Sequence, residues 1–570
     1  MIQTVTHKVQ FCVVGGGLAG VCAAIAAARR GIKTLIMQER PVFGGNASSE
    51  IRMWICGTPF CQETGIIEEL RLENLYRNPY ANYSIWDSIL YEKVKFQENL
   101  TSLLNCSCLD AQMDGDTIKS VTGWQMTTQQ FHKVEAEFFA DCSGDSILAP
   151  LTGAEFRIGR EEATEFDESL GQEKPDRHTM GMSCLIQARE YDHPRKFIAP
   201  SWANVYPDDQ SLKRGHKLDH SQNFWWMELG GDQDSIADTE EVRDELIKTA
   251  FGVWDHIKNR GEHQAEKWDI DFLGFLPGKR ESRRMMGDHI LCQKDVLSGG
   301  KFDDTVAYGG WPIDDHHPGG IRHTGSANRN IFPDGPYGIP LRCLYSKNIS
   351  NLWFAGRNIS ASHVGLSSIR VMATCATMGQ AVGTAVSVAA KYAVRHSREV
   401  LEHIREVQQA LLDDDCFLPG FKREIPEICR NAALVSNPNA PSSVALRNGI
   451  DREYDGMTNI WRSGAGDFVE YDFGKEVELH EIRLVFDSDL HRDERITLAN
   501  YPQNAPEFTM PGTLMKSFEL FADGESFLKV TDNHQRLVKI PVDLKVRKLM
   551  LMLHSSWEHR TSGVFAFDAK

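Results

Sequence analysis

A group of glycines near the start of the chain has the spacing of a phosphate-binding turn. The pattern GxGxxG is formed by Gly15, Gly17 and Gly20 and directly follows an apolar segment. Glycines at this spacing allow a tight turn, let the backbone approach a pyrophosphate and let the next helix pack closely on a strand. Glu39 comes 19 residues after Gly20 and can accept hydrogen bonds from an adenosine ribose. These residues predict a dinucleotide site, and the acid favours FAD or NAD over NADP.

His363 is the first candidate for acid–base chemistry. It lies seven residues after Gly356, on a segment expected to reach the cofactor. If the dinucleotide is a flavin, oxidation of an alcohol needs a base for the hydroxyl proton while a hydride moves to the ring, and an imidazole can be that base. His323 is a second candidate, in a loop rich in glycine and proline with His316 and His317. A structural role in packing stays open for each of these histidines.

A run of basic residues could bind an anion. Residues 279–284 hold four basic groups among six positions, and such groups can hold the electron-rich edge of a flavin or an anionic part of a substrate. We take Arg283 from this run as a third catalytic candidate, with surface ion pairs as the alternative. Tyr337 and Arg342 are lesser candidates for contact with a substrate.

Thirteen cysteines could carry redox or metal chemistry, but their spacing favours neither. An odd number at irregular intervals is typical of a reducing compartment rather than of a disulfide framework. No CxxC pair occurs, and the pairs Cys56/Cys61 and Cys106/Cys108 do not suit a zinc ribbon, so we predict no metal site. Cys56 and Cys61 could form a redox dithiol, which keeps disulfide reduction open as an alternative.

Alternating strands and helices must position these residues. Residues 9–14 predict a short buried strand, 21–30 an alanine-rich helix and 33–37 a second strand. Two further apolar strands precede the glycines at 144 and 356, and a helix of small residues follows from about Ser367. This order predicts an α/β protein with a split, Rossmann-like dinucleotide-binding domain.

Five motifs in this order resemble the FAD-dependent oxidoreductases, which are two-dinucleotide-fold flavoproteins related to the flavin subunit of heterodisulfide reductase. They are GGGLAG at 15–20, ERPVFGGNAS at 39–48, ADCSGDSILA at 140–149, PGKRESRRMMGD at 277–288 and LWFAGRNISASH at 352–363. The resemblance implies FAD as the cofactor, with the last turn placing a helix N-terminus beside the flavin. The iron–sulfur cysteine clusters of the heterodisulfide reductase subunit are absent from the sequence, so an electron relay between clusters is not expected. The cofactor-binding residues implied are Gly15, Gly16, Gly17, Leu18, Ala19, Gly20, Glu39, Arg40, Gly44, Gly45, Asn46, Cys142, Gly144, Asp145, Gly356, Arg357, Ser367 and Ser368.

Charge and hydropathy restrict the partners. With 62 basic and 79 acidic residues the net charge is −17, which disfavours binding to nucleic acid. The uncharged run 11–28 superficially resembles a signal peptide, but three glycines interrupt it and a strand follows. The run 371–394 contains Gln380 and Lys391 and is typical of a buried helix rather than a membrane span. We therefore predict a cytoplasmic protein with no membrane span.

Tryptophans are concentrated in the middle of the chain. Six of the 12 fall between residues 202 and 311. Aromatic faces can stack on sugar rings or on other flat apolar faces, although a role in core packing is the simpler interpretation of each one. As a group they favour an organic, ring-bearing substrate, with a carbohydrate as one candidate.

The last part of the chain has the pattern of strands. After a linker-like stretch at 436–443 the apolar residues alternate with period 2, and a hairpin is expected at 518–530. An antiparallel β-sandwich is predicted. The segments 448–451, 460–461 and 471–474 resemble the galactose-binding-like (discoidin-type) jelly roll, which implies a structural calcium at an acidic turn and sugar binding by end loops. A module that only packs or mediates assembly is the alternative.

These patterns predict an FAD-dependent oxidoreductase that moves a hydride between a small organic substrate, with a sugar or glycoside hydroxyl as one candidate, and the flavin. The electron acceptor is unspecified, and a homo-oligomer stays open. The alternatives are a disulfide reductase or partner-dependent electron carrier, and a carbohydrate-binding protein with an inactive flavin fold. The predicted domains are a first FAD-binding part at 1–160, a substrate or cap region at 161–340, a second FAD-binding part at 341–395, a helical connector at 396–435 and a galactose-binding-like β-sandwich at 436–570.

Overall fold

The computed structural model describes residues 2–59, 61–218, 223–261, 263–437, 441–454, 456–492, 507–558 and 561–570. The chain divides into two compact units. The first consists of residues 1–59, 80–407 and 493–507, and the second of residues 60–79, 408–492 and 508–570. The boundaries of the domains expected from the sequence stay predictions.

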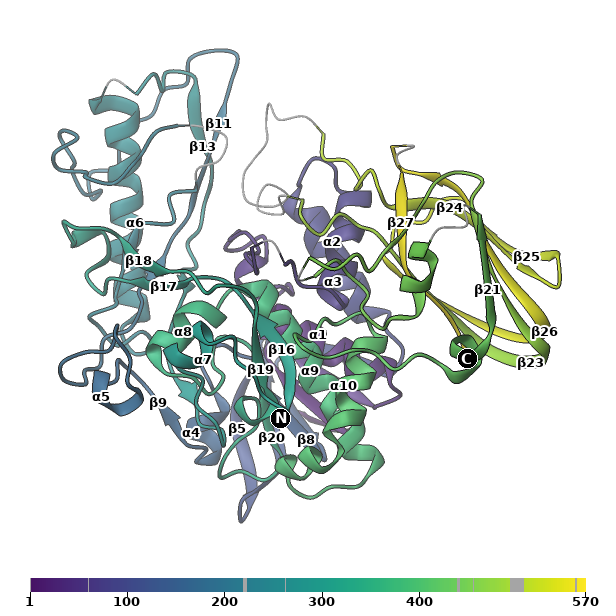
Figure 1. The fold of residues 1–570 in the computed structure, drawn as a ribbon. Coiled ribbons are helices and arrows are strands. Elements are labelled where there is room, and N and C mark those ends of the chain that lie inside the picture. The colour runs from purple at the N-terminus through teal and green to yellow at the C-terminus, as the bar shows by residue number, and fades with distance from the viewer. Residues whose placement is uncertain are drawn as a thin grey trace. The chain divides into compact units, whose positions relative to one another are not determined.

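A five-stranded parallel sheet forms the centre of the first unit (Figure 1). Val14 pairs with both Met37 and Asp141, so the carboxyl ends of three neighbouring strands are level. The three strands are fully buried, as expected for a parallel sheet that is covered on both faces. The order across the sheet is β20 (Leu352–Phe354), β8 (Phe138–Asp141), β2 (Phe11–Val14), β3 (Thr34–Met37) and β4 (Leu100–Leu103). The sheet confirms the predicted Rossmann-like fold.

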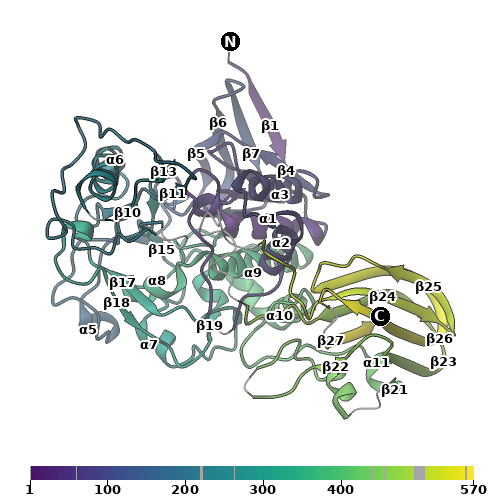
Figure 2. The same ribbon diagram turned by 90° about the horizontal axis from the view of Figure 1, so that it is seen from above.

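Two helices of small residues, α1 (Leu18–Arg29) and α9 (Met372–Lys391), lie side by side in both views (Figures 1 and 2). Their backbones approach closely because Gly379 faces Ala19. A methyl group at Gly379 would lie 2.0 Å from the carbonyl oxygen of Ala19. Among the described residues, no single helix has the length and apolar composition of a membrane span, and α8 (His363–Ile369) and α9 meet that test only as a pair bent by 94°.

The rest of the first unit consists of small sheets and helices around this centre. The sheet β1-β7-β6-β5 contains β1 (Thr4–Lys8), β5 (Cys106–Asp114), β6 (Thr117–Gln125) and β7 (Gln130–Glu135). The smaller sheets are formed by β9 (Phe156–Arg157), β10 (Met182–Ser183), β11 (Ile186–Glu190), β12 (Glu228–Leu229), β13 (Trp268–Leu273), β14 (Gly278–Lys279), β15 (Arg284–Met285), β16 (Thr305–Gly309), β17 (Ile313–His316), β18 (Asn328–Ile331) and β19 (Tyr337–Pro340). Further helices are α3 (Tyr83–Lys95), α4 (Leu148–Thr152), α5 (Ala163–Phe166), α6 (Thr239–Asp255) and α7 (Gln293–Leu297).

The tryptophans of the middle region do not act as one group. Trp226, Trp254 and Trp268 are buried in a single apolar core together with residues of α6 and β11, as the packing interpretation expects. Trp202 is half exposed and packs edge-on against Phe251 of α6. Stacking on a substrate ring therefore has fewer candidates than the sequence gives.

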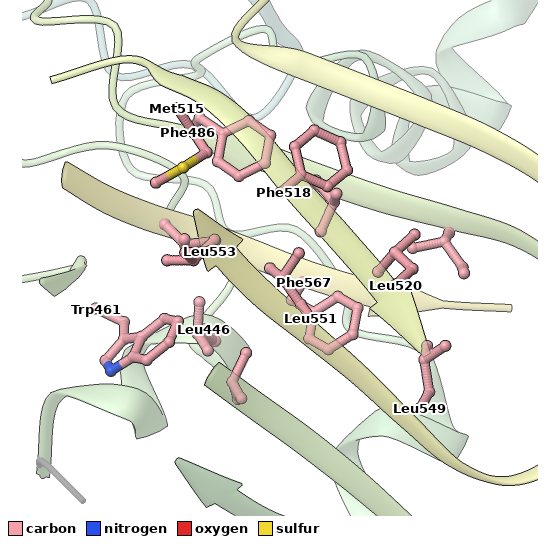
Figure 3. Packing of buried hydrophobic residues seen from close by; sticks show 14 of the residues in the cluster. Leu446, Trp461, Phe486, Met515, Phe518, Leu520, Leu549, Leu551, Leu553 and Phe567 are labelled. Atoms are coloured by element: carbon pink, nitrogen blue, oxygen red, sulfur yellow. The ribbon is translucent and has the colours of Figure 1, made fainter. Parts of the chain in front are cut away.

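The second unit is built on an antiparallel sheet of seven strands. The predicted hairpin is confirmed, since β24 pairs with β25 and the turn lies at Asp523 and Gly524. The core holds aromatic and leucine side chains from several strands (Figure 3), and Leu72 and Leu75 of α2 (Ile66–Arg77) complete it. The strands are β21 (Ala433–Asn437), β22 (Trp461–Ser463), β23 (Phe468–Phe486), β24 (Met515–Ala522), β25 (Glu525–Val530), β26 (Leu537–Ser556) and β27 (Ser562–Ala569), with helices α10 (Ile404–Asp413) and α11 (Glu427–Asn431) before them.

Candidate active site

The glycine turn lies between β2 and α1, at the carboxyl edge of the parallel sheet. Gly15 has a φ of 106°, which favours glycine, and a methyl group there would lie 2.4 Å from the carbonyl group of Cys142. A methyl group at Gly20 would lie 1.9 Å from the carbonyl oxygen of Gly15. At Gly17, in contrast, the nearest atom would be the Cα of Gly45, 4.0 Å away. Two of the glycines are therefore needed for packing, while the third leaves its surface open to a ligand.

The start of α1 faces the same edge and has no side-chain cap. Gly17 is the residue before the helix, so the N–H groups of the first turn, which begins with Leu18 and Ala19, lack a capping side chain. Such a helix end attracts an anion through free N–H groups and the helix dipole. The Gly16 N–H donates to Oε1 of Gln38 at 2.8 Å, and the Gly44 N–H donates to the Gly16 carbonyl at 2.8 Å. These bonds fix the turn against the segment that carries Gly45 and Asn46.

Glu39 and Arg40 directly follow β3 at this edge. The Glu39 side chain is 65% exposed, so its carboxylate is accessible to a ribose. The Arg40 side chain is mostly buried, and its Nε atom has no hydrogen-bond partner among the residues described. The structure thus places both residues at the carboxyl edge of the sheet, and their contact with adenosine stays a prediction.

The third, fourth and fifth motifs meet at Asp145. Its Oδ1 accepts from Nη2 of Arg357 at 2.5 Å and from Oγ of Ser282 at 2.7 Å, while its Oδ2 accepts from Nζ of Lys279 at 2.9 Å. Burial alone would raise the pKa of Asp145, but Arg357 and Lys279 outweigh it and hold the pKa below its usual value. Gly144 makes room for this ion pair, because a methyl group there would lie 2.2 Å from Nη1 of Arg357. Arg283 donates to the Asp145 carbonyl at 3.2 Å.

Unsatisfied polar atoms at this edge fit a bound dinucleotide. Among the buried donors without a hydrogen-bond partner in the described part of the chain, the Nε atoms of Arg40 and Arg357 belong to residues just after β3 and β20. Buried donors are normally hydrogen-bonded, so these two atoms fit a polar ligand at this edge. Together with the open face of Gly17 and the uncapped start of α1, they are the groups that FAD needs. The carboxyl edge of a parallel sheet is also where ligands bind in this fold class.

His363 lies at the start of α8 and is bonded to two carboxylates. Its Nδ1 lies 2.9 Å from Oε2 of Glu281, and its Nε2 lies 3.1 Å from Oδ1 of Asp315. The ring is 2% exposed. Burial alone would lower the pKa of His363, but Glu281 and Asp315 outweigh it and raise the pKa to about 10. The imidazole is therefore charged at neutral pH and donates from both nitrogens. In this form neither nitrogen has a free lone pair, so the ring cannot accept a proton.

Buried partners balance the charges around His363. Arg284, which is 1% exposed, donates to Glu281, to Oε1 of Glu161 at 2.5 Å and to the Ala361 carbonyl at 3.0 Å. The other oxygen of Glu161 accepts from the backbone N–H of His363 at 2.8 Å. Each buried charge thus has an opposite partner, as a stable buried ion pair requires. We call His363, Glu281, Asp315, Arg284 and Glu161 the His363 network.

A second set of buried charges surrounds His316. Its Nδ1 lies 2.7 Å from Oε2 of Glu228, and its Nε2 lies 3.1 Å from Oδ2 of Asp314. Arg370, directly after α8, donates to the same Asp314 oxygen at 2.8 Å, and Arg280 lies 3.5 Å from Glu228. Burial alone would raise the pKa of Glu228, but Arg280 and His316 lower it to about 2. We call these residues the His316 network.

The His316 network contains two groups that lack partners. Within the described residues, Oε1 of Glu228 and Nε of Arg370 are buried and make no hydrogen bond. One is an acceptor and the other a donor, and both belong to side chains already linked through His316 and Asp314. The two networks are themselves joined, because Asp314 and Asp315 are consecutive residues of β17. Such unpaired groups are costly unless a ligand satisfies them.

Other predicted residues lie near these networks or apart from them. Ser367 donates to the His363 carbonyl at 3.1 Å, and Ser368 bonds with the hydroxyl of Tyr337 and the carbonyl of Trp311. Arg342 forms an ion pair with Asp304 at 3.0 Å. His323 stacks on His317 with ring centroids 3.6 Å apart, and its carbonyl accepts from Arg214 at 3.0 Å. His323 is thus engaged in the loop after β17, and its catalytic role stays a prediction.

The acidic turn of the second unit is occupied by arginines. Asp451, at the predicted calcium position, accepts from Arg423 at 3.1 Å and from Arg483 at 2.7 Å. Burial alone would raise the pKa of Asp451, but both arginines outweigh it and hold the pKa well below its usual range. In this conformation its carboxylate serves an internal ion-pair network.

The sequence interpretation missed most members of the two networks. Glu281 lies inside the basic run 279–284, and the acidic pair 314–315 stands directly before His316 and His317. A run of acids beside histidines could have indicated carboxylate–imidazole pairs. Glu161 and Glu228 carry no such local signal, because their partners are far away in the sequence.

The chain is similar to a known protein family and, at low identity, to several solved structures. A family model described as FAD dependent oxidoreductase matches residues 10–411. No curated protein matches the chain. Among solved structures, a geranylgeranyl bacteriochlorophyll reductase-like protein from Thermoplasma acidophilum is 11% identical, covers 72% of this chain and 86% of that chain, and gives a TM-score of 0.31. A glycerol-3-phosphate dehydrogenase from Bacillus halodurans complexed with FAD is 12% identical over 34% of this chain and 43% of that chain, with a TM-score of 0.20. A chitosan-binding module from a chitosanase/glucanase of Paenibacillus sp. IK-5 is 10% identical over 25% of this chain and 97% of that chain, with a TM-score of 0.18. These structures are too distant to indicate a substrate.

Proposed function

The chain belongs to the FAD-dependent oxidoreductase family, and from this premise we propose that it transfers a hydride between FAD and a small organic substrate that carries hydroxyl groups. The observation that carries the proposal is the unsatisfied pair in the His316 network, Oε1 of Glu228 and Nε of Arg370. A hydroxyl group both donates and accepts, so a diol or sugar can satisfy an acceptor and a donor together. A sugar or glycoside hydroxyl fits this chemistry.

The residues at the carboxyl edge of the sheet are suited to hold FAD. The glycine turn and the start of α1 would bind its pyrophosphate, and Glu39 would accept from its ribose. The buried Nε atoms of Arg40 and Arg357 would supply further hydrogen bonds. When bound, FAD supplies the acceptor or donor of the hydride.

His363 in its present bonds is a positioning residue. As a buried cation it orients Glu281 and Asp315, and Asp315 in turn adjoins the His316 network. The base role expected from the sequence requires the bond to Asp315 or Glu281 to open and a proton to leave, which a pKa of about 10 disfavours at neutral pH. That role stays a prediction, and its test is whether His363→Gln retains FAD but loses reduction by substrate.

An anaerobic reduction screen tests the proposal. Candidate polyols, sugars, other alcohols and NAD(P)H are mixed with the FAD-loaded chain, and loss of the oxidised flavin absorbance is followed. We expect bleaching by a hydroxyl-bearing compound, and Glu228→Gln should raise the concentration needed for half-maximal bleaching at least tenfold, because it removes the charge of an otherwise unpaired acceptor. Glu241→Gln, an exposed residue of α6, is the matched control. Bleaching by NAD(P)H alone, or an unchanged Glu228→Gln variant, contradicts the proposal.

Disulfide reduction keeps a separate test. The two cysteines of the candidate dithiol belong to different compact units, Cys56 to the first and Cys61 to the second. Three other thiols are unreactive at neutral pH, because burial raises their pKa to about 12. They are those of Cys106, Cys108 and Cys184. If a dithiol takes part, Cys56→Ser abolishes turnover of any substrate that bleaches the flavin.

Cytoplasmic location, sugar binding by the second unit and a homo-oligomer stay predictions.

A further inference from the structure

Three histidines and an aspartate converge beyond the C-terminal end of α6, in the first unit. His256 directly follows the helix, His263 lies seven residues further, and Asp209 and His216 come from an earlier segment. One nitrogen or oxygen of each side chain lies within 4.8 Å of those of the other three. We call these four residues the histidine cluster, and none of them belongs to the networks around His363 and His316.

The distances in the histidine cluster match a tetrahedral metal site. Nε2 of His256 lies 3.2 Å from Nε2 of His216, 3.1 Å from Nε2 of His263 and 3.1 Å from Oδ1 of Asp209. The same Asp209 oxygen lies 3.6 Å from Nε2 of His216 and of His263. In a tetrahedral zinc site with bonds of about 2.0–2.1 Å, the ligand atoms are about 3.3 Å apart. These five distances, from 3.1 to 3.6 Å, are close to that spacing.

The outer nitrogens of two of the rings determine which atoms face one another. Nδ1 of His256 lies 2.9 Å from the Tyr206 carbonyl, and Nδ1 of His216 lies 2.6 Å from the Arg214 carbonyl. A carbonyl only accepts, so both Nδ1 atoms carry the proton, and in a neutral imidazole Nε2 then presents a lone pair. Two lone pairs 3.2 Å apart repel each other unless a cation lies between them. Backbone carbonyls on Nδ1 are also the usual outer partners of metal-bound histidines.

The alternative to a metal is a proton shared between the rings. It requires at least one imidazolium inside the cluster. A divalent cation relieves the same repulsion without protonating any ring.

The ligand set indicates which metal and what role. Three imidazoles and one carboxylate suit Zn²⁺, whereas Mg²⁺ and Ca²⁺ prefer oxygen ligands. Four protein ligands fill a tetrahedral site, which is typical of structural rather than catalytic zinc. His256 is fully buried, and the Asp209 side chain is 73% exposed, so the ion can enter from solvent on the aspartate side. The chain forms a short π-helical turn at His256–Arg260, a feature often found at functional sites.

We propose that the histidine cluster binds one Zn²⁺ per chain through Nε2 of His216, His256 and His263 and the carboxylate of Asp209. The ion would tie the segment around Asp209 and His216 to the end of α6, and so stabilise the region that carries the apolar core around Trp254. The cysteine spacing predicts no metal site, and it carries no information about these four ligands, which are three histidines and an aspartate spread over residues 209 to 263.

Metal analysis of the FAD-loaded, untagged full chain tests the proposal. The protein is stripped with a chelator, incubated with Zn²⁺, desalted and assayed for zinc and FAD. About one zinc per chain is expected for the wild type and for His193→Gln, a control on an exposed histidine paired with Asp192. His256→Gln should retain less than a tenth of that zinc with the same FAD content.

A second variant and a spectrum keep the test decisive. If His256→Gln loses FAD because it fails to fold, Asp209→Asn replaces it, since this side chain is largely exposed. Its half-saturating zinc concentration should rise at least tenfold. X-ray absorption at the zinc edge should show nitrogen and oxygen neighbours at about 2.0–2.1 Å. The assignment is wrong if the wild-type protein retains no zinc after desalting, or if the variants bind zinc as the wild type does. It is also wrong if the zinc has sulfur neighbours, because the ion would then be bound by cysteines outside the histidine cluster.

Discussion

The pairing of His363 with Asp315 makes a quantitative prediction for Asp315→Asn. The side chain keeps its shape and can still accept from Nε2 of His363, but it loses its charge. The rise of the His363 pKa from 6.5 to about 10 corresponds to roughly 5 kcal/mol of net stabilisation of the imidazolium. Since Glu281 and Asp315 share this stabilisation, we expect the variant to lose about 2–3 kcal/mol of the free energy of unfolding at pH 7.

The loss should depend on pH in a defined direction. His363 has a raised pKa in the folded protein, so its contribution is fully present below pH 6.5 and is lost as the pH rises to about 10. The wild type and Asp315→Asn should therefore differ most near pH 6 and converge towards pH 10. Urea unfolding followed by the release of FAD measures the difference for the unit that holds the cofactor.

Arg329→Gln separates this effect from the other bond of Asp315. Arg329 pairs with Asp315 at 3.0 Å, but its side chain is 60% exposed. Solvent screens an ion pair whose arginine is exposed, so the pair contributes about 0–1 kcal/mol, and Arg329→Gln should unfold almost as the wild type does. If Asp315→Asn changes the free energy of unfolding by less than about 0.5 kcal/mol, or by an amount that stays constant from pH 6 to pH 10, the assignment of a charged, carboxylate-bound His363 is wrong.

Three further predictions follow from other contacts. Gly17→Ala should fold and show a wild-type circular dichroism spectrum but retain less FAD, because its methyl group would lie no closer than 4.0 Å to the described protein atoms. Gly20→Ala, in contrast, should fail to fold, because its methyl group overlaps the Gly15 carbonyl. Arg483→Met should destabilise the second unit by about 3–5 kcal/mol in urea, since it leaves the buried Asp451 carboxylate short of a partner. Calcium should not change the melting temperature of the wild type, because arginines already hold that carboxylate, and a rise on adding calcium would contradict this structure of the turn.

Local sequence patterns predict the glycine turn and the parallel sheet, but they predict little of the His363 network and the His316 network. The glycine turn, its strand and its helix are adjacent in sequence, and each residue type has a steric reason that holds in any context. The same is true of the hairpin around Asp523 and Gly524, whose turn chemistry is local. The level carboxyl ends of β2, β3 and β8 follow from their alternation with helices, so the edge that we propose for FAD could also be predicted.

The two buried networks could not be predicted, because their members meet only in the folded chain. Glu161, Glu281 and Asp315 converge on His363 from segments far apart in the sequence. A single acidic residue is most often solvated, and the acidic stretch near Glu161 is typical of a surface loop. Its burial depends on Arg284, which itself looks like a surface charge within the basic run. Each charge is explained only by its partner, and hydrophobic periodicity contains no information about the pairs.

The burial of so many charges favours a functional role for them over a role in stability. A buried ion pair that is replaced by well-packed apolar side chains often leaves a protein as stable or more stable, so stability alone does not require the His363 network. Its neighbour, the His316 network, keeps a carboxylate oxygen and a guanidinium nitrogen that find no partner among the described residues, which costs free energy in the absence of a ligand. The helix α8 connects the two networks, with His363 at its start and Arg370 directly after its end. Such an arrangement, a charge-balanced network beside unsatisfied polar groups, preorganises a site for a polar substrate. For this reason Glu228 and Arg370, rather than His363, are the first residues to test for substrate binding.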